Sequence, residues 1–155
     1  MRLLSMLLIV GLLTQLISAA EVADMSGTWQ LNVKRSKWGK RASPESVVLQ
    51  IDHKEPKLKY TGKVTDAQGG VSTFSFDGAI DGKEYPVKEG DTERKITIKR
   101  LSPYTTTAEY KSADGKVNEV TTNTTSRDGK TLVRRVTRTD AEGKTTWTEA
   151  YDKQQ

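Results

Sequence analysis

The sequence contains no cysteine and only one histidine in 155 residues. Without cysteine the chain forms no disulfide, so its stability must come from packing and sheet hydrogen bonds. The usual zinc sites are built from cysteine and histidine, and His53 alone cannot complete one. His53 lies near the end of a predicted strand among charged residues, and we expect it to be exposed. We expect no metal and no cofactor.

Recognisable catalytic motifs are missing as well. The sequence has no Gly-x-Ser-x-Gly elbow, no Walker loop and no Rossmann fingerprint. Carboxylates such as Glu119 and Glu149 are present, but nothing in the sequence marks them as a catalytic pair. We therefore expect a protein that is not an enzyme.

Only one stretch of the chain is strongly apolar, and it lies at the start. Arg2 supplies a short positive region, residues 3–13 an apolar core, and Ser18-Ala19-Ala20 a small-residue cleavage site. The core is short for a membrane span of about 20 residues. We interpret residues 1–20 as a signal peptide cleaved near Ala20, and residues 21–155 as one domain without a transmembrane segment. The expected location is secreted or periplasmic, and the lack of cysteine favours a bacterial source.

The chain has little excess of charge of either sign. Removing Arg2 with the signal leaves 24 basic and 20 acidic residues, a formal charge of +4. Most aromatic residues share strand parity with valine, leucine and isoleucine, so we expect no nucleic-acid platform. The one basic segment, Lys34–Arg41, carries five positive charges around Trp38. It is a candidate for weak contact with an anionic surface, or a solvated loop whose Trp38 tucks over the mouth of a barrel.

Glycine turns punctuate the chain at regular intervals. Three Asp-Gly-Lys tripeptides begin at Asp81, Asp114 and Asp128, and Glu142-Gly143-Lys144 follows them. An Asp-Gly pair between alternating segments predicts a tight hairpin, because a type I′ turn needs positive φ at its central residues. The last three turns are about 14 residues apart, which is the spacing of strands joined by short hairpins. This pattern predicts an up-and-down antiparallel meander, and such a meander avoids exposed edges by closing into a barrel.

The segments between the turns alternate between apolar and polar residues, which is typical of strands with one buried face. Pro86 cannot donate a ladder hydrogen bond, so we expect the short segment around it to lie at a rim or a bulge. No segment has sustained helical periodicity. The ten predicted strands cover Gly27–Val33, Ser46–His53, Lys57–Thr65, Val71–Asp77, Glu84–Val87, Glu93–Ser102, Tyr104–Ser112, Lys116–Ser126, Lys130–Asp140 and Lys144–Lys153.

The strand Lys130–Asp140 carries arginine on both faces. Arg134 and Arg138 share one face and Arg135 lies on the other, so at least one arginine points inward. A buried arginine needs a carboxylate, backbone carbonyls or a ligand anion as its partner. Pairing of Arg134 or Arg138 with Glu149 on the last strand would neutralise the charge of the buried arginine inside the barrel.

Both ends of residues 21–155 resemble the calycins, the superfamily of lipocalins and fatty-acid-binding proteins. The segment Ser26-Gly27-Thr28-Trp29-Gln30-Leu31 resembles their Gly-x-Trp signature, and Thr148-Glu149-Ala150-Tyr151-Asp152-Lys153 resembles the Thr-Arg-x-Tyr-Glu-Lys close of the fatty-acid-binding proteins. Asp81–Pro86 is similar to a segment of small exported bacterial proteins called lipocalin-like. The resemblance implies a structural role for Gly27 and Trp29, with Trp29 packed near the last strands against Arg134, Arg135 or Arg138.

Two departures argue against a fatty-acid carrier. In the family an Arg-x-Tyr pair grips the fatty-acid carboxylate, but Glu149 stands at the arginine position here, two residues before Tyr151. An acid there repels a carboxylate. The family also places two helices after the first strand, and the segment Lys34–Glu45 is too short for both.

We therefore predict an all-β chain, a single up-and-down antiparallel β-barrel of about 8–10 strands, calycin-like, which acts as a monomer. Our leading hypothesis is a binding protein for a small, mostly apolar ligand in the barrel. The alternative is a ligand-free envelope module that acts through its exterior and the loop 34–41. The expected binding residues are Tyr60, Phe74, Phe76, Ile98, Tyr110, Arg134, Arg138 and Tyr151, with Leu49, Ile51 and Leu58 also inside.

Overall fold

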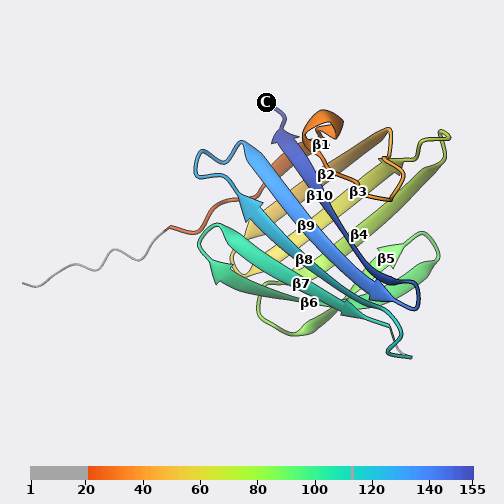
Figure 1. Cartoon of the computed structure of the whole chain (residues 1–155). Helices are drawn as coiled ribbons and strands as arrows, with labels where there is room; N and C mark the ends of the chain where they lie inside the picture. The colour runs from red at the N-terminus through yellow and green to blue at the C-terminus, as the bar shows by residue number, and fades with distance from the viewer. Residues whose placement is uncertain (1–20, 113) are drawn as a thin grey trace, which may run out of the picture.

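The computed structural model describes residues 21–112 and 114–155 and shows ten antiparallel strands (Figure 1). The predicted signal peptide lies outside these residues. Within the described ranges, no helix has the length and apolar character of a membrane span. A 3-10 turn, η1 (Val33–Arg35), follows the first strand. The strands are β1 (Gly27–Leu31), β2 (Ser46–Lys54), β3 (Lys57–Thr65), β4 (Val71–Ala79), β5 (Glu84–Glu89), β6 (Thr92–Ser102), β7 (Thr105–Lys111), β8 (Asn118–Thr125), β9 (Thr131–Asp140) and β10 (Gly143–Lys153).

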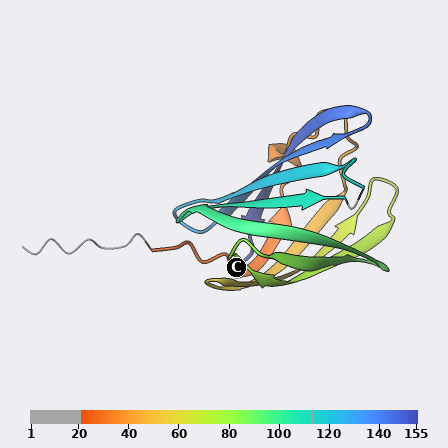
Figure 2. The ribbon, with the colours of Figure 1, turned by 90° about the horizontal axis from the view of Figure 1, so that it is seen from below.

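The sheet closes into one barrel because its first and last strands pair. Every strand pairs with its neighbours in sequence, and β1 pairs with β10, where Trp29 lies opposite Lys153 and Leu31 opposite Tyr151. Figures 1 and 2 show the strands wrapped around a single interior. The predicted all-β, up-and-down barrel is confirmed, and β3 has the predicted bounds.

The hairpin connections differ from the predicted type I′ turns. In the turn after β8, the Gly129 N–H donates to the Ser126 carbonyl at 2.9 Å, and Gly129 has φ of +68°. Asp128 does not have positive φ, and its Oδ1 accepts from the Lys130 N–H at 3.1 Å. This matches the longer hairpin in which a type I turn precedes a glycine in the left-handed region. The Asp-Gly signal located the turn, but the aspartate acts through its side chain instead of through positive φ.

The strand containing Pro86 is part of the barrel wall, not a rim or bulge. β5 pairs with β6 along its whole length, with Pro86 opposite Lys95. Its pairing with β4 covers only three positions and stops at Val87, directly after Pro86. Proline has no N–H to donate to a neighbouring strand. It is therefore tolerated at this point of β5, where β5 is not paired with β4.

Inward-facing side chains form two apolar clusters. Burial of one large apolar side chain contributes about 1.5–3 kcal/mol. Tyr60 stacks on Phe76, a member of the first cluster, with ring centroids 5.0 Å apart. The first cluster contains Met25, Leu58, Phe76, Ile80, Val87, Ile96 and Ile98, and the second contains Trp29, Leu31, Val47, Leu49, Leu132 and Tyr151.

The segment before β1 closes one end of the barrel. Met25 is buried in the first cluster, and the Trp29 indole N–H donates to the Met25 carbonyl at 2.9 Å. Trp29 is fully buried. The expectation that an arginine of β9 packs on Trp29 is wrong. The cation near it is Lys153, whose Nζ lies 5.5 Å from the ring centroid, because Lys153 is opposite Trp29 in the register.

His53 is buried at this closed end, which corrects the expectation of an exposed strand end. Its ring is only 3% exposed because the segment before β1 folds over it, and Nδ1 accepts the Met25 N–H at 3.3 Å. Its Nε2 therefore donates to Glu55 at 2.8 Å. Glu55 also accepts two hydrogen bonds from Arg100. Arg100 first, and His53 second, hold the pKa of Glu55 below its ordinary value against the opposing effect of burial.

We predict that Gly62→Ala destabilises the barrel by about 1–3 kcal/mol, as overpacking does. A Cβ at Gly62 would clash with the Phe74 ring. The change should therefore cost less in a Phe74→Leu background, where the ring is gone. Urea unfolding of the wild type, both single variants and the double variant measures this coupling. Equal costs of Gly62→Ala in both backgrounds would contradict the packing account.

Candidate functional site

A cavity of about 900 Å³ occupies the barrel interior. It extends from Met25 at the closed end to the opposite rim, where Arg41, Thr92 and Thr145 line it. Sites for small molecules have volumes of roughly 300–1,000 Å³. The interior is therefore large enough for a ligand and is not filled by side chains alone.

One wall of the cavity is apolar. It is formed by β2 to β6, whose alternation turns one side chain in two inward. The Phe74 ring meets Tyr60 edge to face at a centroid distance of 6.1 Å, and such pairs contribute about 0.5–1.5 kcal/mol beyond burial. The apolar lining contains Leu49, Ile51, Leu58, Tyr60, Phe74, Val87, Ile96 and Ile98.

The opposite wall holds a buried ion pair. Arg134 on β9 lies directly across from Glu149 on β10, and its Nη1 donates to Glu149 Oε2 at 3.1 Å. On the other side of β9, Asn123 of β8 accepts from Arg134 Nε at 3.2 Å. The Trp147 indole and the Tyr151 hydroxyl also donate to Glu149, at 2.8 and 2.7 Å. The pairing of Arg134 with Glu149 expected from the sequence is thus present.

The ion pair sets the charge of both partners. Burial opposes ionisation of Glu149, but Arg134, followed by the hydrogen bonds from Tyr151 and Trp147, holds its pKa below the ordinary value. Burial likewise opposes the charge on Arg134, and Glu149 more than offsets it, so the pKa of Arg134 is raised. Burial raises the pKa of Tyr151, so its hydroxyl remains a donor. Both members of the pair are charged at neutral pH.

A second polar cluster lies nearer the rim. Arg94 contacts Glu89 at 2.7 Å, and Arg138 donates to Asp140 at 3.1 Å. Both arginines also lie 3.8 Å from Glu119. The Arg94 guanidinium stands over the Tyr110 ring, 4.8 Å from its centroid. Arg94 and Arg138 therefore each have carboxylate partners within the protein.

The basic loop 34–41 is docked on β10. Lys37 and Thr148 exchange two backbone hydrogen bonds of 2.7 and 2.8 Å, and Trp38 is half-buried against the second apolar cluster. The residue that reaches the mouth is Arg41, whose guanidinium lies 3.8 Å from the centre of the Trp147 ring. Arg41, and not the expected Trp38, contributes to the lining of the cavity.

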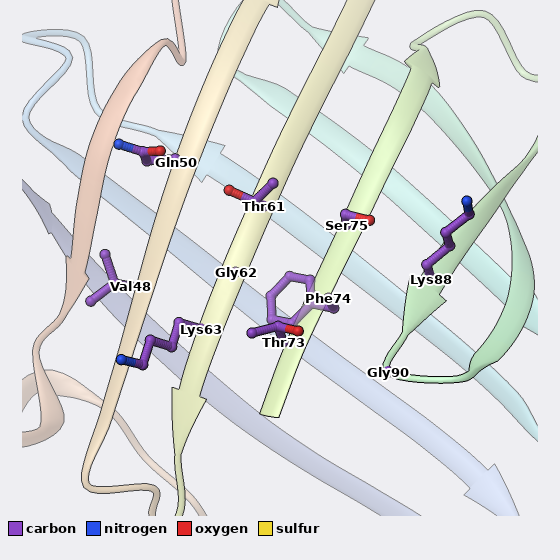
Figure 3. A pocket seen from close by; sticks show the side chains of 10 residues that line it. All are labelled: Val48, Gln50, Thr61, Gly62, Lys63, Thr73, Phe74, Ser75, Lys88 and Gly90. Carbon is purple, nitrogen blue, oxygen red and sulfur yellow. The ribbon is translucent and has the colours of Figure 1, made fainter. Parts of the chain in front are cut away.

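A shallower hollow lies on the outer wall over β2 to β4 (Figure 3). Its side chains include Val48, Gln50 and Lys63, which alternate with the inward set. Gly62 leaves a gap in this surface, and the Phe74 ring lies behind it. The hollow has no cluster of paired charges comparable to that of the interior, so the interior cavity is the stronger candidate site.

Six of the eight residues predicted to bind a ligand line the cavity, namely Tyr60, Phe74, Ile98, Tyr110, Arg134 and Arg138. Phe76 and Tyr151 also lie inside, but they are packed within the apolar clusters behind the lining. The face of β9 that points into the barrel is therefore the one that carries Arg134 and Arg138. Their role in ligand binding stays a prediction.

Sequence reasoning missed several polar lining residues. Arg94 on β6 shares the parity of Ile96 and Ile98, which was a usable signal. Thr121 and Asn123 lie on β8, where threonine occupies both faces and the inward side cannot be recognised from the pattern. The role of Glu119 cannot be recognised from its own strand, because its two arginine neighbours come from other strands.

No known family model and no curated protein matches this sequence. Among solved structures, the barrel is similar to zebrafish ileal bile acid-binding protein, solved in complex with cholic acid. The similarity covers 84% of this chain and 98% of that chain, with a TM-score of 0.58 and 17% sequence identity. This chain has the calycin fold. It is a closed ten-stranded barrel like that of the zebrafish protein, in agreement with the calycin-like barrel predicted from the sequence.

We predict that the stability contributed by Glu149 is lost in acid. Its folded-state pKa is below the ordinary value of 4.5, so the contribution is present above that pH and disappears as the pH falls through the folded pKa. Glu149→Gln should therefore cost about 1–3 kcal/mol near neutrality and much less well below pH 4. Urea midpoints of both proteins across this range test it. A difference in urea midpoint between the two proteins that does not become smaller in acid would contradict the lowered pKa of Glu149.

Proposed function

We propose that this protein is an exported, non-catalytic binding protein that holds one small, mostly apolar molecule inside its barrel. The observation that carries the proposal is the interior cavity of about 900 Å³, with an apolar wall facing a polar one. An amphipathic interior of this size suits a molecule with an extended apolar body and a polar group. The similar zebrafish barrel, solved with cholic acid, supports a small lipophilic ligand. Export rests on the signal peptide predicted for residues 1–20, and we infer a monomer.

The alternative, a surface module acting through loop 34–41, has less support. Arg35 is paired with Asp152 at 2.5 Å, and Arg41 is stacked on Trp147. Trp38 is half-buried against the barrel and is not free to insert into a membrane surface. The loop behaves as part of the barrel wall, and its lysines, Lys34, Lys37 and Lys40, are exposed.

A cavity-filling variant tests the proposal. Ala108 lines the cavity on β7, so Ala108→Phe places a ring in the space that the ligand would occupy. We predict that the uncharged fluorescent probe N-phenyl-1-naphthylamine binds the wild type and binds Ala108→Phe at least about tenfold more weakly, a difference of about 1.4 kcal/mol. Fluorescence titration gives both dissociation constants.

Thr107→Phe is the matched control, because Thr107 is next to Ala108 on the same strand and faces outward. It should bind the probe as the wild type does. Equal binding by all three proteins would place the probe outside the barrel and contradict the proposal.

A further inference from the structure

The charges on the deep polar wall cancel within the protein. Both oxygens of Glu149 are engaged: Oε1 accepts from Trp147, and Oε2 accepts from Tyr151 and Arg134. The Glu149 side chain is only 12% exposed, and the pair carries no net charge. Within the described residues, the Arg134–Glu149 pair therefore leaves neither a free anionic acceptor for a cationic ligand nor an uncompensated cation for an anionic one in the deep part of this wall.

Hydrogen-bond donors remain on this wall. Arg134 uses Nε for Asn123 and Nη1 for Glu149, whereas Nη2 makes no hydrogen bond within residues 21–112 and 114–155. Its side chain keeps 27% of its surface accessible while it lines the cavity. On the facing apolar wall, the Tyr60 hydroxyl also lacks a partner among the described residues, and burial raises its pKa to about 12, which keeps it protonated. These groups can donate to an oxygen that carries no charge.

We propose that the barrel selects an uncharged amphiphile, whose hydroxyl, ether or carbonyl oxygen accepts hydrogen bonds from Arg134 Nη2. This inference rests on the proposed function and names the class of ligand. A carboxylate placed beside Arg134 would also lie beside Glu149 and would leave one buried negative charge without a partner. Nearer the rim, Arg94 and Arg138 are already matched by Glu89, Asp140 and the shared Glu119.

Competition between two ligands with the same chain length tests the inference. Dodecan-1-ol and dodecanoate are titrated against bound N-phenyl-1-naphthylamine at neutral pH, where dodecanoate is ionised. We expect the alcohol to displace the probe from the wild type at an at least tenfold lower concentration, because a tenfold preference needs only about 1.4 kcal/mol. Dodecanoate that competes as well as the alcohol, or better, would overturn the inference.

Charge variants separate this explanation from packing. Glu149→Gln leaves Arg134 unmatched and should reverse the preference toward dodecanoate. Arg134→Gln combined with Glu149→Gln restores neutrality and should retain the preference for the alcohol. Glu142→Gln, the same chemical change at the exposed turn before β10, should behave as the wild type. Equal shifts in the single and double Glu149 variants would overturn the electrostatic explanation.

Failure of the inference can be distinguished from failure of the proposed function. A wild-type barrel that binds the probe but prefers dodecanoate contradicts the neutral-ligand inference alone. A wild-type barrel that takes up neither the probe nor dodecan-1-ol contradicts both. If Glu149→Gln does not fold, the wild type and the double variant still decide, since both are predicted to prefer the alcohol.

Discussion

The interior of this barrel depends on the ion pair between Arg134 and Glu149. Moving an unpaired guanidinium out of water costs several kcal/mol, so an inward arginine requires a partner that the fold itself supplies. The register provides it, because Glu149 on β10 and Asn123 on β8 both lie directly opposite Arg134. A slip of one residue in β9 would turn Arg135 inward and expose its present inner face. The pair thus fixes the register of three strands and also determines the polarity of the cavity.

The remaining interior follows from this arrangement. β2 to β6 contribute the apolar wall, with Glu89 and Arg94 as charged residues nearer the rim, while β8 to β10 contribute the deep charged and hydroxyl-bearing wall. One end is closed by the segment that buries Met25 against the first apolar cluster, and His53, Glu55 and Arg100 satisfy the polar groups beneath it. Arg41 from the docked loop lines the opposite rim. The result is a cavity with a closed apolar end and a neutral polar wall, which favours an amphiphile without charge.

Most of the fold could be predicted from alternation and turns. The strand Lys57–Thr65 alternates without interruption and was located with its observed bounds. The partner of Arg134 could be named because Glu149 was the carboxylate in the same inward row of the neighbouring strand. For His53 and Trp29, where the predictions failed, the deciding contact came from a distant part of the chain. His53 is buried by a segment 28 residues earlier, and Trp29 meets Lys153 across the barrel closure.

A crystal structure of the protein with dodecan-1-ol tests the central claim most directly. We predict one alcohol inside the barrel, its oxygen within hydrogen-bonding distance of Arg134 Nη2 and its chain along Phe74 and Ile98, with the bond between Arg134 and Glu149 intact. An alcohol bound only on the outer wall, or a Glu149 turned away so that Arg134 holds an anion, would contradict it.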